Sequence, residues 1–166
     1  MSTQDNLEAA FSGESQANRR YLAFAIQAER DGYPQVARLF RAAAEAETVH
    51  AIAHLRVMGG IEDTLKNLET AATGESYEFK EMYPKFLTEA RDEGLKPAEF
   101  SFKNALAVEE VHFDLFNRAL SALKEGRELA DEDIFVCPVC GNTVEGTVPD
   151  ICPVCHVKGE KYKKIG

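Results

Sequence analysis

Four long segments of the chain place apolar side chains at alternating spacings of three and four residues, the pattern of amphipathic α-helices. Glycine or proline lies near the ends of these segments, where helices commonly start and stop. Residues 61–73 carry no clear inward stripe, and we expect them to form a long crossover between the second and third helices. Pro84 predicts a local kink in the third segment. The pattern predicts an all-α four-helix bundle with helices over residues 6–31, 34–58, 74–94 and 97–126.

Carboxylates and imidazoles interrupt the apolar stripes at positions where leucine or phenylalanine would be expected. The second segment has Glu47 and His50 on its stripe, and the fourth has Glu109 and His112. Residues i and i+3 of a helix share a face, so each Glu-x-x-His pair directs a carboxylate and an imidazole at one point. The remaining stripe carboxylates are Glu14 in the first segment and Glu75 and Glu78 in the third.

An inward-facing set of five glutamates needs compensating positive charge. Each unpaired buried carboxylate costs several kcal/mol, and five would exceed the roughly 5 to 15 kcal/mol of net stability of a domain. The stripes contain no matching arginine or lysine, so two divalent or trivalent cations would supply the charge. A glutamate from each of two helices plus a Glu-x-x-His from each of two others is the ligand pattern of di-iron and di-manganese bundles. The third segment has one glutamate more than that minimum.

Other polar residues near the stripes have simpler interpretations. A single Glu-x-x-His is more often a solvated pair, but two of them on core stripes favour metal binding. His54 lies one turn beyond His50 and could be a ligand, but Ala51 rather than an acid precedes it by three residues, so we interpret it as a core histidine or as one that lies beside the ligands. Tyr21 and Tyr83 could direct their hydroxyl groups at the inner carboxylates, or act simply as large packing residues with a polar tip.

Composition limits the classes of partner. The chain has 166 residues, enough for one core of about 130 residues and a small second module. Its formal net charge of −9 argues against nucleic acid or an anionic membrane as a partner. The opening Met-Ser-Thr-Gln-Asp lacks the features of a signal peptide, and no apolar run reaches the length of a membrane span. We expect a cytoplasmic protein.

All four cysteines fall after an acidic linker at residues 131–133, in two Cys-x-x-Cys pairs separated by eleven residues. This spacing is a strong signal for a tetrahedral four-sulfur metal site, which iron and zinc both accept. A module this small needs the metal to fold. We therefore predict two domains, residues 1–130 and 131–166, the second holding its metal with Cys137, Cys140, Cys152 and Cys155.

The second cysteine pair also matches the attachment motif of c-type haem, because His156 follows Cys155 directly. That interpretation leaves the first pair without a role, and no export signal accompanies it. We interpret His156 as a surface residue of the second cysteine turn.

The chain resembles the rubrerythrin family from end to end. The resemblance rests on Gly13-Glu14-Ser15-Gln16-Ala17, Glu47-x-x-His50, Gly74-Glu75-x-x-Glu78, Glu81-Met82-Tyr83-Pro84, Glu109-x-x-His112 and the four rubredoxin-like cysteines. It implies a ferritin-like di-iron domain joined to a rubredoxin-like Fe(Cys)4 domain, and a peroxidase that reduces hydrogen peroxide to water.

The resemblance also implies roles for the individual ligands. Glu47 and Glu109 would bridge two non-haem irons, Glu75 and His112 would be terminal ligands of one iron, and Glu14 of the other. Glu78 and His50 would exchange at that second iron as the redox state changes, since an anionic oxygen ligand suits the more highly charged ion. Tyr21 and Tyr83 would donate hydrogen bonds around this centre.

The family further implies a homodimer in which the rubredoxin-like site faces the partner's di-iron site. An external donor, such as an NAD(P)H-dependent reductase or a rubredoxin, would supply the electrons. Two other functions stay open: a ferroxidase or iron-handling protein, and a di-metal bundle whose tail is a structural zinc ribbon. Asn142 and His156 depart from the family pattern, where an aromatic residue and a glycine are common, but neither departure removes a ligand.

Overall fold

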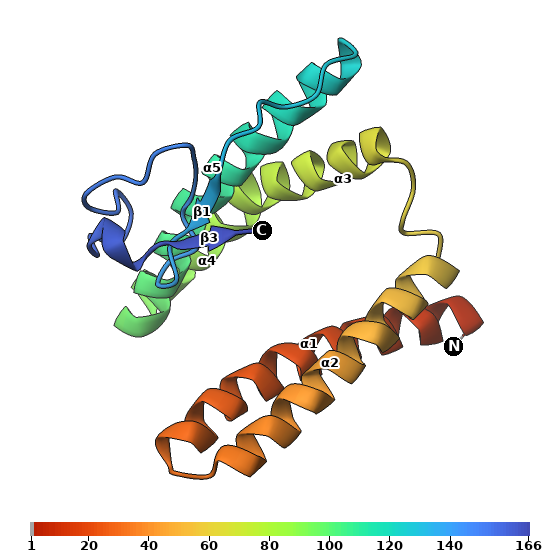
Figure 1. The fold of residues 1–166 in the computed structure, drawn as a ribbon, viewed down its shortest axis with the longest axis vertical. Helices are drawn as coiled ribbons and strands as arrows, with labels where there is room; N and C mark the ends of the chain where they lie inside the picture. Colours follow the sequence, from red (N-terminus) through yellow and green to blue (C-terminus); the bar gives the residue numbers. More distant parts are fainter. Residues whose placement is uncertain (1) are drawn as a thin grey trace. The chain divides into compact units, whose positions relative to one another are not determined.

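The computed structural model describes residues 2–166, which form two compact units, one ending at Glu62 and the other running from Asp63 to Gly166 (Figure 1). The first unit is a pair of helices joined by a tight turn. The second unit contains the remaining helices and a small module of three short strands at the C-terminus.

The first unit packs α1 (Thr3–Arg30) against α2 (Pro34–Val57). Ser2 caps α1 in a capping box with Asp5, which satisfies amide groups that the first turn leaves unbonded. The helices approach through small side chains, and one polar residue, Asn18, is buried between them. Its amide donates to the carbonyl oxygen of Ala44 at 2.6 Å and to Oγ1 of Thr48 at 2.8 Å, which fixes how the two helices align.

The predicted crossover at residues 61–73 is wrong, because α3 begins at Thr64 and runs to Tyr77. The connection between α2 and α3 is therefore confined to residues 58–63. Asp63 explains the early start, since its side chain accepts the backbone N–H of Lys66 at 3.0 Å as an N-cap. The short apolar stripe of this stretch is also partly buried, with Leu65 and Leu68 half-buried and Ala72 buried.

The kink expected at Pro84 takes the form of a π-helical turn, η1 (Glu78–Met82), between α3 and α4 (Tyr83–Asp92). Tyr83 donates its backbone N–H to the carbonyl oxygen of Glu78, five residues earlier. Proline has no N–H to donate and its ring clashes with an ordinary preceding turn, so the wider turn accommodates it. Such π turns often lie at functional sites, and this one begins at a predicted metal ligand.

The last helix, α5 (Lys96–Lys124), packs along α3 and α4 and is followed by the strand module. The strands β1 (Ile134–Val136), β2 (Thr143–Glu145) and β3 (Lys163–Ile165) form an antiparallel sheet in the order β2-β1-β3. A short 3-10 helix, η2 (Gly159–Lys161), precedes β3. Gly159 is required there, because a Cβ atom would lie 1.9 Å from the carbonyl oxygen of Pro149. The long helical segments with a small four-cysteine strand module confirm the predicted fold class.

Candidate metal centre

Three predicted ligands meet between α1 and α2. The ligand atoms of Glu14, Glu47 and His50 all lie within 4.8 Å of one another, and His50 Nδ1 is 3.1 Å from Oε2 of Glu47. A hydrogen bond between the two carboxyl groups raises the pKa of Glu14 and lowers that of Glu47, as expected when two acids share one proton. A bound cation would replace that proton. This group does not include His54, which is half-buried.

A second group of three lies between α3 and α5. Nδ1 of His112 is 2.9 Å from Oε2 of Glu109 and 3.8 Å from Oε1 of Glu75. Burial, followed by the charge of Glu109, raises the pKa of Glu75 to about 7. Two half-buried carboxylates and one imidazole nitrogen directed at one point form a ligand set that suits a hard or borderline cation.

Glu78 and the two tyrosines lie around these groups rather than in them. Glu78 is half-buried, and burial followed by the charge of Glu109 raises its pKa, so it is near the second group without joining its closest cluster. Burial and then the charges of Glu109, Glu78 and Glu75 raise the pKa of the Tyr83 hydroxyl, which therefore lies in the field of three carboxylates. Tyr21 packs its ring against Phe24 and Phe40, which fits the packing interpretation.

The four cysteines form a third cluster. Their sulfur atoms lie within 4.8 Å of one another, with Cys137 to Cys155 and Cys140 to Cys152 both at 3.6 Å. A tetrahedron of sulfurs about 2.3 Å from a central metal has edges of roughly 3.8 Å, so the four thiols are already arranged for one ion. All four are free thiols. The observed spacing thus fits an Fe(Cys)4 or Zn(Cys)4 site.

The two cysteine turns are built alike. Gly141 donates its N–H to the carbonyl oxygen of Cys137 at 2.9 Å, and His156 donates to Cys152 at 3.0 Å. Both residues have positive φ, +88° for Gly141 and +62° for His156. Histidine tolerates this left-handed conformation better than most residues with a side chain, so it can stand where glycine is common. His156 is exposed, as predicted.

Sequence reasoning missed a hydrogen-bonded chain behind the sulfur cluster. The buried amide of Asn142 donates to the Tyr162 hydroxyl at 2.8 Å, and that hydroxyl bonds the sulfur of Cys152. Burial raises the pKa of the Cys152 thiol, but the backbone N–H of Cys155, the Tyr162 hydroxyl and the N–H of Val154 outweigh it and bring that pKa to about 6. In the sequence, Asn142 is distinguished only as a departure from the family pattern, and nothing distinguishes Tyr162.

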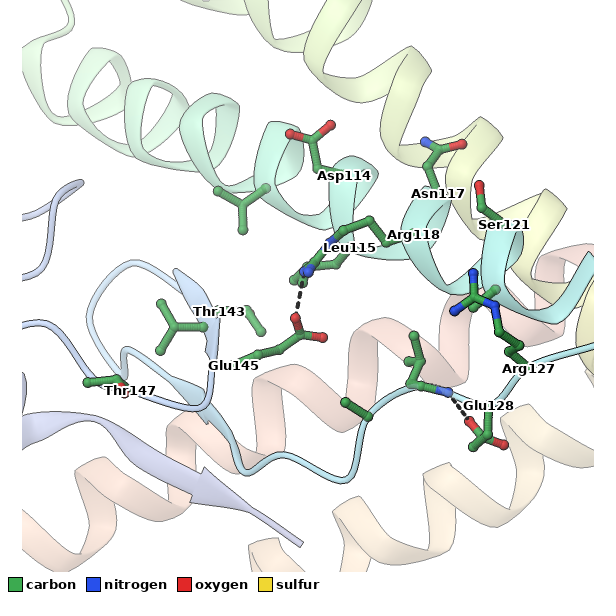
Figure 2. A pocket seen from close by; sticks show the side chains of 15 residues that line it. Asp114, Leu115, Asn117, Arg118, Ser121, Arg127, Glu128, Thr143, Glu145 and Thr147 are labelled. Atoms are coloured by element: carbon green, nitrogen blue, oxygen red, sulfur yellow. Dashed lines mark hydrogen bonds and ion pairs between the residues drawn. The ribbon is translucent and has the colours of Figure 1, made fainter. Parts of the chain in front are cut away.

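One cleft, of about 1020 Å³, is lined by none of the residues of the carboxylate and imidazole groups (Figure 2). Its walls come from α5, from residues 127–130 and from β2 and the turn that follows it. Arg118 of α5 spans it to Glu145 of β2 at 2.6 Å, and Thr143 lines the same wall. None of the three predicted metal clusters within residues 2–166 lies in this cleft.

No helix among residues 2–166 combines the length and the apolar character needed to cross a membrane. The helices, the carboxylate and imidazole groups and the four-cysteine module together define the class of helical metalloproteins with a rubredoxin-like tail. Comparison with family models narrows this class. A model described as rubrerythrin matches residues 5–120, and a model described as the rubredoxin-like domain of rubrerythrin matches residues 135–163. The chain belongs to the rubrerythrin family.

Relatives from this family align with nearly the whole chain. The chain is 37% identical to rubrerythrin-2 of Clostridium acetobutylicum, over 97% of this chain and 95% of the relative. It is 36% identical to a rubrerythrin of Nitratidesulfovibrio vulgaris, over 99% of this chain and 94% of that protein. A solved structure of nigerythrin in a mixed-valence state is similar with a TM-score of 0.58 and 33% identity, covering 99% of this chain and 87% of that one.

Proposed function

We propose that this protein is a hydrogen peroxide reductase, with a di-iron centre that reacts with the peroxide and an Fe(Cys)4 site that returns electrons to it. The observation that carries the proposal is the presence of two carboxylate and imidazole groups and one four-sulfur cluster in a single chain of this family. The two groups would hold a pair of ferrous ions, which would supply the two electrons that, together with two protons, convert hydrogen peroxide to two waters without releasing a radical.

The proposed di-iron ligands are the residues predicted from the sequence: Glu14, Glu47, His50, Glu75, Glu78, Glu109 and His112. Their carboxylates supply the negative charge that favours the ferric state. His50 already lies with Glu14 and Glu47, whereas Glu78 lies outside the closest cluster of its own unit. By resemblance to the family, Glu78 would enter as a ligand and His50 would leave when the iron is oxidised. Tyr83 is the better placed of the two tyrosines to donate a hydrogen bond to these carboxylates.

The remaining parts of the proposal come from the family. One solved structure of nigerythrin is described as fully reduced and all ferrous, which supports iron in the corresponding sites of this chain. An NAD(P)H-dependent reductase or a rubredoxin would reduce the sulfur-bound iron. We further propose a cytoplasmic homodimer, and a boundary at residue 130 between the ferritin-like and rubredoxin-like domains.

A spectroscopic experiment under anaerobic conditions tests this function. Protein purified without oxygen should be reddish, and dithionite should bleach it if iron occupies the four cysteines. The reduced protein should then be reoxidised much faster by hydrogen peroxide than by dioxygen. Faster reaction with dioxygen would instead indicate a ferroxidase, and a colourless protein with full metal content would indicate a zinc ribbon.

A matched pair of variants locates the reaction. Glu47→Gln should lower the rate of peroxide reduction by about 100-fold or more. Loss of a residue that only hydrogen-bonds a metal ligand typically lowers activity about 10- to 100-fold, and loss of the ligand itself should have a larger effect. Glu45→Gln is the control, since Glu45 lies on the same helix with an exposed side chain. Equal activity of both variants would contradict the proposed centre.

A further inference from the structure

An apolar pocket of about 340 Å³ lies between α3, α5 and the strand module, within the second compact unit. Most of its wall consists of aliphatic and aromatic side chains: Leu68 of α3, Leu115, Phe116 and Ala119 of α5, and Leu129 and Ile134 of the chain that leads into β1. The ring of His112, a proposed iron ligand, is also part of the wall. The pocket therefore adjoins the group formed by His112 and two carboxylates.

The pocket extends along α5 away from His112. Phe116 and Ala119 follow His112 by four and seven residues, so they lie on the same face of the helix, the second about 11 Å further on. Ala119 is buried, whereas Leu129 and Ile134 are 39% and 38% exposed. The pocket thus meets solvent at Leu129 and Ile134, and its interior lies at Ala119.

The polar groups in the wall already bond other protein groups. Nε2 of His112 lies 3.1 Å from Oγ1 of Thr143, which also donates to the carbonyl oxygen of Gly141 at 3.1 Å. Glu145 accepts from Arg118 at 2.6 Å (Figure 2). A hydrophilic ligand would find few partners here, whereas an apolar ligand would displace only water that the wall bonds poorly.

The volume of the pocket suits a ligand larger than hydrogen peroxide. A water molecule takes up about 30 Å³ in the liquid, so a molecule of two oxygen atoms would leave most of the pocket unfilled. An apolar cavity of about 150 Å³ is large enough to bind benzene, and this pocket is about 340 Å³. It therefore has room for a compact alkyl group or a substituted aryl group.

We propose that this pocket binds the apolar part of an organic hydroperoxide, and that the protein reduces this class of substrate as well as hydrogen peroxide. The hydroperoxide group would lie at the His112 end of the pocket, where Nδ1 of the ring faces Glu109 and Glu75. Cumene hydroperoxide is a compact aryl member of this class. The inference rests on the proposed function, because it uses the same two ferrous ions.

The proposed reaction is balanced in atoms and electrons. The O–O bond of the hydroperoxide breaks, and the two ferrous ions supply two electrons and become ferric. Two protons come from solvent. One oxygen atom leaves as water, and the other stays on the organic group as an alcohol. The external donor of the proposed function returns the two electrons.

Ligand binding tests the pocket without any measurement of activity. Cumyl alcohol, the unreactive product of cumene hydroperoxide, would be titrated into zinc-loaded protein, which is diamagnetic and inert to redox change. Saturable shifts are expected in the methyl resonances of Leu68, Ala119 and Leu129. The methyl resonance of Ala122, which lines the cleft in Figure 2 but not this pocket, should not shift.

Two results of this titration would overturn the proposal. One is the lack of any saturable shift up to the solubility limit of cumyl alcohol. The other is a shift of the same methyl resonances with xenon but not with cumyl alcohol, which would identify a site for a diatomic gas such as dioxygen.

Steady-state kinetics of the iron-loaded protein tests whether the pocket selects the substrate. Ala119→Leu fills the interior and should lower kcat/KM for cumene hydroperoxide, relative to kcat/KM for hydrogen peroxide, by about tenfold or more, because one methylene group already changes such a ratio by about tenfold. Ala122→Leu is the matched control, since Ala122 is an equally buried alanine of α5 outside the pocket. It should keep the native ratio.

A second variant covers the case in which Ala119→Leu does not fold. Leu129 is exposed and lies outside the helices and strands, so Leu129→Asp leaves these elements intact. It should lower the same ratio, because an apolar group would have to lie against a carboxylate. Leu95→Asp, at an exposed leucine outside the pocket, is the control. Native ratios in both Ala119→Leu and Leu129→Asp would overturn the proposal.

The native protein distinguishes failure of this inference from failure of the proposed function. Reduction of hydrogen peroxide without reduction of cumene hydroperoxide would overturn the inference and leave the proposed function standing. Reduction of neither peroxide would overturn the proposed activity with both substrates, and saturable binding of cumyl alcohol would then still support the apolar ligand site.

Discussion

Nδ1 of His112 lies 2.9 Å from Oε2 of Glu109, one helical turn earlier on α5. This distance is within hydrogen-bond range. A metal ion placed between the same atoms would be bound by both of them. The local geometry of α5 thus brings together two of the three ligands of this group, and the third, Glu75, comes from α3.

Metal binding should stabilise the fold. Ferrous iron or Co²⁺ at 100 times its dissociation constant should add about 2.7 kcal/mol to the free energy of unfolding, because only the folded chain brings the ligands together. Thermal unfolding with and without the ion measures this gain. Glu109→Gln should lose most of it, whereas Glu110→Gln, at an exposed neighbouring position, should retain it. Identical gains in both variants would contradict the ligand assignment.

The raised pKa of Glu75 predicts the pH dependence of the metal-free protein. Burial, then the charge of Glu109, raises this pKa from 4.5 to about 7 in the folded state. The folded chain therefore holds a proton that the unfolded chain releases between these two values, so stability falls as the pH rises from 4.5 towards 7. Solvent screening limits the effect to the order of 1 kcal/mol.

Urea unfolding of the metal-free protein at pH 5 and pH 7.5 measures this dependence, and Glu75→Gln should flatten it. Metal affinity should follow the opposite trend and increase with pH through the same range, because the ion displaces the proton. If the native chain became more stable than Glu75→Gln as the pH rose from 5 to 7.5, the pKa of Glu75 would not be raised in the folded state.

The hydrogen bond from Tyr162 to Cys152 should tune the sulfur-bound iron. A donor to a thiolate stabilises the more negative, reduced form of the site, so Tyr162→Phe should lower its reduction potential. A hydrogen bond worth about 1 kcal/mol more in the reduced form corresponds to roughly 40 mV for one electron. Redox titration followed by the visible spectrum measures the shift. A potential that rises, or that does not change, would exclude this role for the hydroxyl group.

The buried amide of Asn18 should stabilise the pairing of α1 with α2. Asn18→Ala removes the bonds to Ala44 and Thr48 and should cost about 1 to 3 kcal/mol. Thr48 also donates to the carbonyl oxygen of Ala44 at 3.1 Å, so this carbonyl group stays hydrogen-bonded in the variant. We therefore expect a loss of stability near the lower end of that range. Denaturant unfolding measures the loss, and Gln16→Ala, at an exposed position on the same helix, is the control. A cost equal to that of Gln16→Ala would show that the bonds to α2 contribute nothing.

Helical spacing explains why much of the candidate site was predictable. Glu47 with His50 and Glu109 with His112 are neighbours because i and i+3 share a helix face. In the structure the two side chains of each pair lie at hydrogen-bond distance, 3.1 Å and 2.9 Å respectively. The cysteine pairs were equally clear, since each Cys-x-x-Cys spacing closes one turn. The start of α3 at Thr64 was missed because its apolar stripe is short, although Asp63 was available as a cap signal.

By itself, then, the sequence determined the helical class, the residues that form the carboxylate and imidazole groups and the four-sulfur cluster, because these depend on local periodicity and short spacings. Only the tertiary structure decided that Asn18 bonds α2, that Tyr162 bonds Cys152, and that Thr143 contacts His112. The partners in these contacts lie between 10 and 31 residues apart in the chain. Hydrogen bonds at such separations depend on how whole elements pack, and no periodicity within a single element encodes them.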